Sequence, residues 1–281
     1  MPTLLSIGHG YSARALARRL PEWRIIGTTR SGEKAELLRS EGIEPLIWPG
    51  SDLGPALADA THLLTSVAPD PDGDPVLRHH GSQIAAGGFD WVGYLSTTGV
   101  YGDHDGGWVD ETAPLNPATR RGQMRKMAEA AWAALDLPLH IFRLAGIYGP
   151  DRGPFAKVRA GTARRIIKPG QVFSRIHVED IASVLAASIA RPDPGVAYNV
   201  CDDDPAPPQD VIAHAAELLG LPLPPAIPFE EAEMSPMARS FYAESKKVSN
   251  RRIKEELGVT LRYPDYRTGL AALLEGEKSP R

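Results

Sequence analysis

Leu4-Leu5-Ser6-Ile7-Gly8-His9-Gly10-Tyr11-Ser12-Ala13 is the stretch that decides the fold of this chain. It starts as a short apolar strand, and apolar residues at helical spacing follow it. A strand, a G-x-G-x-x-A turn and a helix make the first half of a dinucleotide-binding βαβ unit. Gly8 permits the tight turn, Gly10 lets backbone approach a pyrophosphate, and Ala13 is small enough for close packing of the helix on the strand.

This turn predicts where a nucleotide binds. The pyrophosphate is expected on the N-terminal NH groups of the helix, where the helix dipole favours negative charge. A plain structural turn is the alternative, because glycine turns are common. Further contacts are expected at the end of a later buried strand, near residues 61–67. The predicted cofactor-binding residues of these two regions are Gly8, Gly10, Tyr11, Ser12, Ala13, Ser66, Val67 and Ala68.

The end of the second strand indicates which dinucleotide binds. Residues 23–28 have the pattern of that strand, and Thr29, Arg30 and Ser31 follow it. An NAD-binding unit usually has Asp or Glu here for the ribose 2′-hydroxyl, and this chain has none. One guanidinium and two hydroxyls suit a 2′-phosphate, so NADP is favoured over NAD. The alternative is a solvated loop arginine.

Composition sets limits on the class of protein. Of the 281 residues, 42% are hydrophobic and 23% are charged, which is ordinary for a globular protein. The formal net charge of −4 gives no indication of nucleic acid or membrane as a partner. Cys201 is the single cysteine, which excludes an intrachain disulfide and a cysteine-based metal site. Without a signal peptide or long apolar run, a cytoplasmic protein is expected, and the sequence leaves room for a homodimer.

Strand and helix patterns alternate as far as residue 205, which predicts an α/β fold with a doubly wound, Rossmann-like parallel sheet. After that point proline-rich segments interrupt regular structure, and two further helices are expected near residues 245–257 and 265–275. We therefore expect residues 1–150 and 172–205 to form the dinucleotide-binding domain. Residues 151–171 and 206–281 would form a small lobe on the substrate side.

Four later stretches resemble one family. Residues 95–103 (LSTTGVYGD) resemble the S-[ST]-x-x-VYG segment of the extended short-chain dehydrogenases/reductases, the epimerase and dehydratase group. Residues 143–150 (RLAGIYGP) resemble their R-x-x-N-x-YGP stretch, and residues 175–180 (RIHVED) their R-x-x-HV-x-D stretch. Residues 198–200 (YNV) match a motif near their last core strand. The order of these pieces implies an NAD(P)-dependent enzyme of oxidoreductase, epimerase or dehydratase type.

The resemblance breaks down at the catalytic pair. Members of the family carry Y-x-x-x-K on one helix face, and the lysine lowers the tyrosine pKa so that the phenol can exchange a proton. Aligning that helix puts Arg121 and Arg125 at these two places, with Arg121 lying 24 residues after Thr97 (121 − 97). Arginine stays protonated and cannot act as a general base. Arg125 could still donate hydrogen bonds to ribose hydroxyls.

Other residues are candidates to replace the missing tyrosine. Thr97 occupies the family's Ser/Thr position and could hydrogen-bond a substrate carbonyl or hydroxyl, or simply bond to backbone at a strand end. Tyr101 and Tyr148 lie in segments that reach the carboxyl edge of the sheet, where open α/β folds bind ligands. Both are alternatively packing residues of tight turns. The predicted catalytic residues are therefore Thr97, Tyr101, Arg121 and Arg125, and no metal site is expected.

A basic stretch follows the second of these four motifs, residues 143–150. Residues 152–175 hold seven Lys and Arg side chains and no Asp or Glu. In the resembled family this region covers the substrate side of the cleft, which suggests an anionic ligand such as a nucleotide sugar. A solvated basic face is the alternative. The predicted substrate-binding residues are Tyr148, Arg159, Arg164, Arg165 and Arg175.

Two classes of function stay open at this point. One is an NADP-dependent enzyme of epimerase, dehydratase or reductase type with a rearranged acid/base group. The other is a non-catalytic NADP-binding redox sensor or regulatory protein. The substitutions at Arg121 and Arg125 favour the second class, and the basic substrate side favours the first.

Overall fold

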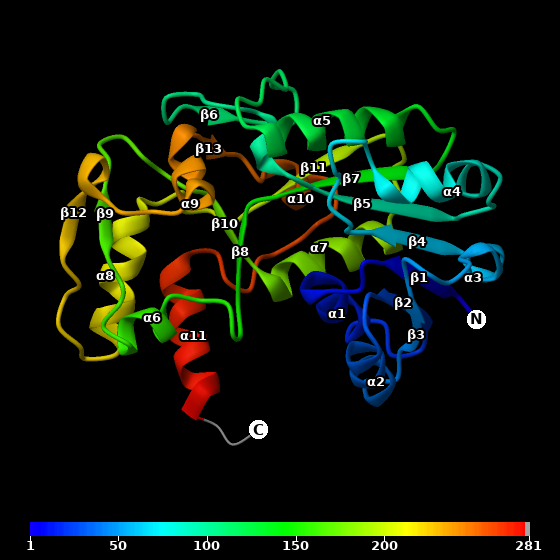
Figure 1. The fold of residues 1–281 in the computed structure, drawn as a ribbon, viewed down its shortest axis with the longest axis horizontal. Coiled ribbons are helices and arrows are strands. Elements are labelled where there is room, and N and C mark those ends of the chain that lie inside the picture. The colour runs from blue at the N-terminus through cyan, green and yellow to red at the C-terminus, as the bar shows by residue number, and fades with distance from the viewer. Residues whose placement is uncertain (279–281) are drawn as a thin grey trace.

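A central sheet of seven parallel strands organises the computed structural model, which describes residues 1–278 (Figure 1). The order of its strands is β3-β2-β1-β4-β5-β7-β11. Their bounds are β1 (Thr3–Ile7), β2 (Arg24–Thr29), β3 (Glu44–Ile47), β4 (His62–Thr65), β5 (Trp91–Thr97), β7 (Leu139–Leu144) and β11 (Ala197–Val200). The order reverses between β1 and β4, which is the Rossmann arrangement, so the predicted fold class is confirmed.

Helices cover both faces of this sheet, as the continuous apolar strands require. One face carries α1 (Tyr11–Ala17), α2 (Gly32–Ser40) and α7 (Val178–Ala190), and the other carries α3 (Gly54–Asp59), α4 (Pro75–Ala85) and α5 (Arg120–Ala133). Neighbouring residues of β1 show the alternation, because Leu4 packs into the first core and Leu5 into the second.

A smaller hydrophobic cluster lies beyond the carboxyl edge of the sheet (Figure 1). It is formed by α6 (Phe155–Arg159), α8 (Pro208–Leu218) and α11 (Tyr266–Lys278). A two-stranded sheet of β9 (Arg165–Ile167) and β12 (Ala226–Pro228) lies beside α8. The small lobe expected on the substrate side thus has a core of its own. Helix α8 was not among the elements expected from the sequence, where the proline-rich segments after residue 205 were expected to interrupt regular structure.

The segment after this lobe differs from the expectation. In place of a helix over 245–257, the chain forms β13 (Lys247–Val248), which pairs with β6 (Trp108–Val109), and then the short helix α10 (Arg251–Glu255). Val248, Ile253 and Leu261 are buried in the core of the main sheet. Residues 247–261 therefore pack with the dinucleotide-binding domain, although the expected lobe included them.

The remaining elements are short and lie near the carboxyl edge of the sheet or the lobe. They are β8 (Gly146–Tyr148), β10 (Arg175–His177), α9 (Pro236–Ser240) and the 3-10 turns η1 (Thr98–Val100), η2 (Phe229–Glu231) and η3 (Phe241–Ala243). No helix within residues 1–278 is long and apolar enough to cross a membrane.

Candidate functional site

A cleft of about 1190 Å³ lies between the carboxyl edge of the sheet and the small lobe. On one side it is lined by the glycine turn after β1, the ends of β4 and β5, and the start of α5. On the other side it is lined by residues of α6, α8, α9 and α11. Ligands of open α/β folds bind at this edge, next to the point where the strand order reverses.

The glycine turn is held to its neighbours by hydrogen bonds. Gly8 has a φ of +83°, which favours glycine, and its NH donates to Thr28 Oγ1 at 2.7 Å. Ser66 Oγ donates to the carbonyl oxygen of Gly8. Of the residues predicted here, Gly8, Gly10, Tyr11, Ser12 and Ser66 line the cleft. The turn is thus fixed between β2 and β4 and open toward the cleft.

The other predicted residues of this region do not line the cleft. Ala13 is buried on the inner face of α1, where its small side chain lets the helix pack on the sheet. Val67 takes part through its backbone, because its carbonyl oxygen accepts a hydrogen bond from Arg125 at 3.3 Å. Ala68 is outside the lining set. Their expected contacts with a cofactor therefore stay predictions.

Thr29, Arg30 and Ser31 lie at the end of β2, beside the turn but outside the lining of the cleft. The Thr29 carbonyl accepts from the NH of Trp48 at 2.8 Å, and Ser31 Oγ caps α2 by accepting from the NH of Lys34 at 3.4 Å. Arg30 is exposed and makes no ion pair with any described residue. The Ser31 hydroxyl is therefore engaged in the cap of α2, whereas the Arg30 side chain is exposed and keeps its charge without a partner among the described residues.

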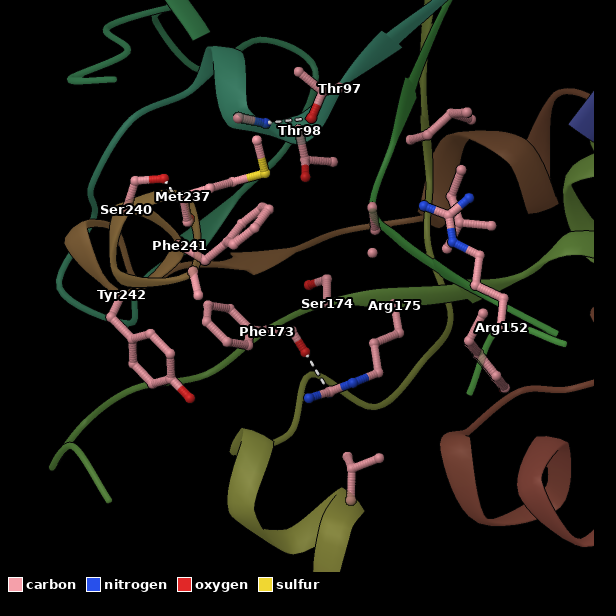
Figure 2. Close-up of a pocket in the computed structure, with 18 of the residues that line it drawn as sticks. Thr97, Thr98, Arg152, Phe173, Ser174, Arg175, Met237, Ser240, Phe241 and Tyr242 are labelled. Atoms are coloured by element: carbon pink, nitrogen blue, oxygen red, sulfur yellow. Dashed lines mark hydrogen bonds between the residues drawn. The ribbon is translucent and has the colours of Figure 1, made fainter. Parts of the chain in front are cut away.

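The two candidates on the segment after β5 lie in different environments. Thr97 lines the cleft, and its Oγ1 accepts from the NH of Gly99 at 3.1 Å (Figure 2). Tyr101 is fully buried, with its hydroxyl donating to Asn199 Oδ1 at 2.7 Å and accepting from Arg143 Nη1 at 2.9 Å. The 3-10 turn η1 directs Tyr101 into the core, which contradicts its expected catalytic role.

Both arginines at the positions of the family's catalytic pair line the cleft from α5. Arg125 Nη1 donates to Tyr94 Oη and to the carbonyl oxygen of Leu95, each at 2.9 Å, as well as to Val67. The Arg121 guanidinium lies 4.6 Å from the centre of the Phe241 ring. Arg125 thus holds the ends of β4 and β5 together, and Arg121 contacts the segment that closes the far side of the cleft.

The residues predicted on the substrate side divide into two groups. Arg164, Arg175 and Tyr148 line the cleft. Arg159 instead pairs with Glu277, and Arg165 Nε donates to the carbonyl oxygen of Pro224 at 2.9 Å. Neither of these two lines the cleft, so their predicted contact with substrate is contradicted. Sequence spacing could not separate the groups, because α6 and β9 are too short for a clear periodicity.

Three further cations of the cleft were not singled out from the sequence. Arg152 and Lys157 line it from the segment after β8, and Lys246 lines it from the segment before β13. The Arg152 guanidinium lies 5.6 Å from the centre of the Tyr11 ring, at the start of α1. Tyr11 Oη donates to the carbonyl oxygen of Pro150 at 2.8 Å. These contacts bring Arg152 to the glycine turn, although 139 residues separate Tyr11 from Pro150 along the chain.

The cleft is electropositive. Its lining includes two carboxylates, Glu233 and Glu244, among the described residues. Lys246 pairs with Glu244 at 2.8 Å. The other cations of the lining make no ion pair within residues 1–278, and they are Arg121, Arg125, Arg152, Lys157, Arg164 and Arg175. Burial lowers the pKa of Arg175. Unpaired cations that share a partly desolvated cleft repel one another, and an anionic ligand would relieve that repulsion.

Together, the reversed strand order, the glycine turn and the cleft define a Rossmann-like α/β protein. No family model matches the chain. The solved structure of a functionally unknown conserved protein from Silicibacter pomeroyi DSS is 66% identical, with a TM-score of 0.95, over 98% of this chain and 99% of that one. A putative NAD-dependent epimerase/dehydratase from Methylobacillus flagellatus is 27% identical, with a TM-score of 0.73, over 99% of each chain.

Three further proteins are similar to this chain. Protein YeeZ of Escherichia coli (strain K12) is 29% identical over 94% of this chain and 97% of its own. The 3-diazoavenalumate denitrifying reductase of a Streptomyces species is 28% identical over 58% of this chain and 55% of its own. UDP-glucuronic acid 4-epimerase from Bacillus cereus, solved in complex with NAD, shares the fold with a TM-score of 0.78 over 97% of this chain and 96% of its own, at 15% identity.

The chain belongs to the same family as the Silicibacter pomeroyi protein, and its fold is that of the extended short-chain dehydrogenases/reductases of the NAD-dependent epimerase/dehydratase-like type. The resemblance expected from the four sequence motifs is thereby confirmed.

Proposed function

We propose that this protein binds a nicotinamide dinucleotide along the glycine turn and acts on an anionic substrate held in the same cleft. The residues of the turn fit such a cofactor. A Cβ on Gly8 would lie 3.0 Å from Ser66 Oγ, whereas a Cβ on Gly10 would meet no atom closer than the Gly8 carbonyl oxygen, at 3.7 Å. The turn is therefore closed toward the protein and open toward a ligand. When bound, the nicotinamide would supply hydride transfer.

Arg152 would complete the cofactor site on the side of Tyr11, at the start of α1. Its guanidinium lies over the Tyr11 ring, and it makes no ion pair with a described residue. A guanidinium at this place would face the pyrophosphate, which carries the negative charge shared by NAD and NADP. At the end of β2, the exposed Arg30 supports NADP over NAD.

The main observation in support of an anionic substrate is the set of unpaired cations in the cleft. Arg164 and Arg175 lie on the side of the lobe, away from the glycine turn. Nucleotide sugars are one class of candidate, since UDP-glucuronic acid 4-epimerase shares the fold. Another relative carries the name 3-diazoavenalumate denitrifying reductase, which indicates a reduction and a substrate other than a nucleotide sugar. We propose oxidoreductase or epimerase-like chemistry, in the cytoplasm and without nucleic acid as partner. A homodimer stays a prediction.

One observation favours the second candidate, a non-catalytic NADP-binding sensor. Helix α5 contains no tyrosine. Burial raises the pKa of Tyr11 to about 12, and it also raises the pKa values of Tyr148, Tyr242 and Tyr266. These four phenols line the cleft and would stay protonated near neutral pH. Their raised pKa values work against any of these four phenols acting as the base that the family's tyrosine supplies.

Ligand titrations separate these functions. NADPH and NADH are titrated against the protein by fluorescence, and a panel of nucleotide sugars, phosphorylated metabolites and carboxylates is then screened by thermal shift in the presence of NADPH. An anion present at about 100 times its Kd should stabilise the protein by about 2.7 kcal/mol. If NADPH binds and no anion adds to its shift, the sensor replaces the enzyme. If neither dinucleotide binds, the cofactor proposal fails.

A double variant tests the missing pair. Arg121→Tyr with Arg125→Lys returns the family's tyrosine and lysine to α5. If the lost phenol limits catalysis, turnover of a substrate found in the screen should rise above the wild-type rate. High wild-type turnover that survives Arg121→Ala would instead place the proton donor elsewhere, with Thr97 the next residue to change.

A further inference from the structure

Apolar side chains dominate the part of the cleft that lies against the small lobe. Met237 and Phe241 line the cleft, and both are exposed for hydrophobic residues of their size. Solvent reaches 67% of the Met237 surface and 47% of the Phe241 surface. In Figure 2 they lie with Phe173 on one side of the hollow, between Thr98 and Arg175. Exposed apolar surface inside a cleft is surface that an apolar ligand group would cover.

The polar groups that a sugar needs are scarce at the same place. Among the described residues that line the cleft, none is Asn, Asp, Gln or His. Of the two lining carboxylates, Glu244 is paired with Lys246, and Glu233 is exposed. Sugar hydroxyls that enter a cleft without matched donors and acceptors lose hydrogen bonds to water, which is costly.

Four serine and threonine hydroxyls on the lobe side are already bonded to the backbone. Ser174 Oγ accepts from the NH of Val248 at 3.1 Å, and Ser235 Oγ accepts from the NH of Ala238 at 3.2 Å. Ser240 Oγ donates to the Met237 carbonyl oxygen at 2.8 Å, and Thr162 Oγ1 donates to that of Lys157 at 3.4 Å. They cap and fix local structure, which leaves the hydroxyls of Thr98, Tyr242 and Tyr266 as the ones at this end of the cleft without a hydrogen-bond partner among the described residues, two of them on aromatic rings.

The positive charges of Arg175 and Arg164 are available to a ligand at this end of the cleft. Arg175 Nη1 donates to the carbonyl oxygens of Phe173 at 2.8 Å and of Ala206 at 3.0 Å. Its Nε and Nη2 make no hydrogen bond with a described residue. Arg164 lines the same cleft, with Nη1 bonded to the carbonyl oxygens of Gly161 and Ala163. Both guanidiniums therefore keep donors for an anionic group.

We propose that the substrate is an apolar organic acid, best an aromatic one, rather than a sugar derivative. Its apolar body would cover Phe173, Met237 and Phe241, and its carboxylate would bind Arg164 and Arg175. This inference rests on the anionic substrate of the proposed function and selects one chemical class within it.

Probes of equal charge test the inference by isothermal titration calorimetry, with and without NADPH. 3-Phenylpropanoate and glucuronate each carry one carboxylate, the first on an apolar body and the second on a hydroxylated one. We expect 3-phenylpropanoate to bind at least about tenfold more tightly than glucuronate. It should also bind about tenfold more tightly than its neutral amide, because a hydrogen bond to a charged group contributes more than a neutral one.

Variants locate the binding. The double variant Met237→Ser, Phe241→Ser removes exposed apolar surface and should weaken 3-phenylpropanoate about tenfold. Leu223→Ser is its control, because Leu223 is 57% exposed and lies outside the cleft lining. Arg164→Ala should weaken the acid and spare the amide. Arg165→Ala, one position along and outside the cleft, should leave both unchanged.

Three results would overturn the inference in different ways. Equal or tighter binding of glucuronate or UDP-glucuronate would leave an anionic substrate but not an apolar one. Binding of none of the acids, while NADPH binds, would remove the anionic substrate as well. Unchanged affinity in the Met237, Phe241 double variant would place the acid elsewhere. A failure of NADPH to bind would overturn the proposed cofactor alone, since the titrations without it still judge the acid.

Discussion

Arg30 and Arg152 approach the glycine turn from different elements, and they would contact different parts of one dinucleotide. Arg30 follows β2, and Arg152 follows β8 and lies over Tyr11. A 2′-phosphate occurs only in NADP, whereas the pyrophosphate is common to both cofactors. Their substitution should therefore produce two distinct patterns of affinity.

Arg30→Ala should weaken NADPH about 10- to 100-fold and leave NADH nearly unchanged, because a charge-assisted hydrogen bond contributes about 1.5–3 kcal/mol. Fluorescence titration with both cofactors measures the effect. Lys34→Ala, a change on α2 that also removes one positive charge, is the control. Equal affinities of the wild-type protein for NADPH and NADH would contradict the preference for NADP.

Arg152→Ala should weaken NADPH and NADH by a similar factor of about 10 or more. ADP-ribose, which keeps the pyrophosphate without nicotinamide, should lose affinity to the same degree. Arg159→Ala serves as the matched control, because Arg159 pairs with Glu277 outside the cleft. A loss confined to NADPH would show that Arg152 contacts the 2′-phosphate instead.

At the scale of elements, α5 is fixed to the sheet by a buried ion pair. Arg143 Nη2 on β7 donates to Glu129 Oε2 on α5 at 2.9 Å, with side chains 8% and 4% exposed. Ser96 Oγ on β5 and Tyr101 Oη join the same network. This network sets the rotation of α5, and it therefore decides that Arg121 and Arg125 face the cleft.

Glu129→Ala should destabilise the protein by about 3–5 kcal/mol, because it leaves the Arg143 guanidinium buried without its partner. Urea denaturation followed by circular dichroism gives the change in unfolding free energy. Glu255→Ala breaks the exposed pair with Arg251, 3.6 Å apart, and should cost less than about 0.5 kcal/mol. Similar losses in both variants would show that burial does not decide the strength of these pairs.

At the scale of the whole molecule, one buried carboxyl group makes the stability of the protein depend on pH. Asp202 is 1% exposed, and neither of its carboxyl oxygens has a hydrogen-bond partner among the described residues. Burial raises its pKa to about 8, from an ordinary value of 3.8. The folded protein thus keeps a proton that the unfolded chain releases between these two pH values.

The stability of the wild-type protein relative to Asp202→Asn should therefore fall as pH rises from about 5 to about 8, by about 1 kcal/mol per pH unit. Buried His9 and His177, whose pKa values burial lowers to about 4, act in the opposite direction below about pH 6.5. They are present in both proteins and cancel in the difference. Urea denaturation across this range measures it, and parallel curves for the two proteins would contradict the raised pKa.

The sequence alone determined the fold and the location of the turn. Local spacing was enough for β1, the G-x-G-x-x-A turn and α1, because a strand buried on both faces and an amphipathic helix each leave a continuous pattern. It was not enough for residues 247–261, where the elements are too short to show a periodicity. Helix α8 has apolar residues at helical spacing, such as Val211 and Ala215, and it was missed among the prolines that flank it. These segments were decided by the apolar surfaces against which they pack.

The composition of the cleft was decided by the tertiary structure. A basic stretch in the sequence does not show which side chains meet, and Arg159 and Arg165 pair or hydrogen-bond outside the cleft while Arg152 reaches the glycine turn. Tyr101 also belongs to a family motif, that of residues 95–103, and yet its side chain is buried in the core. A motif reflects local backbone geometry, which neighbouring residues impose. The lining of a cleft depends instead on contacts between segments more than 100 residues apart. Only the folded chain brings those segments together.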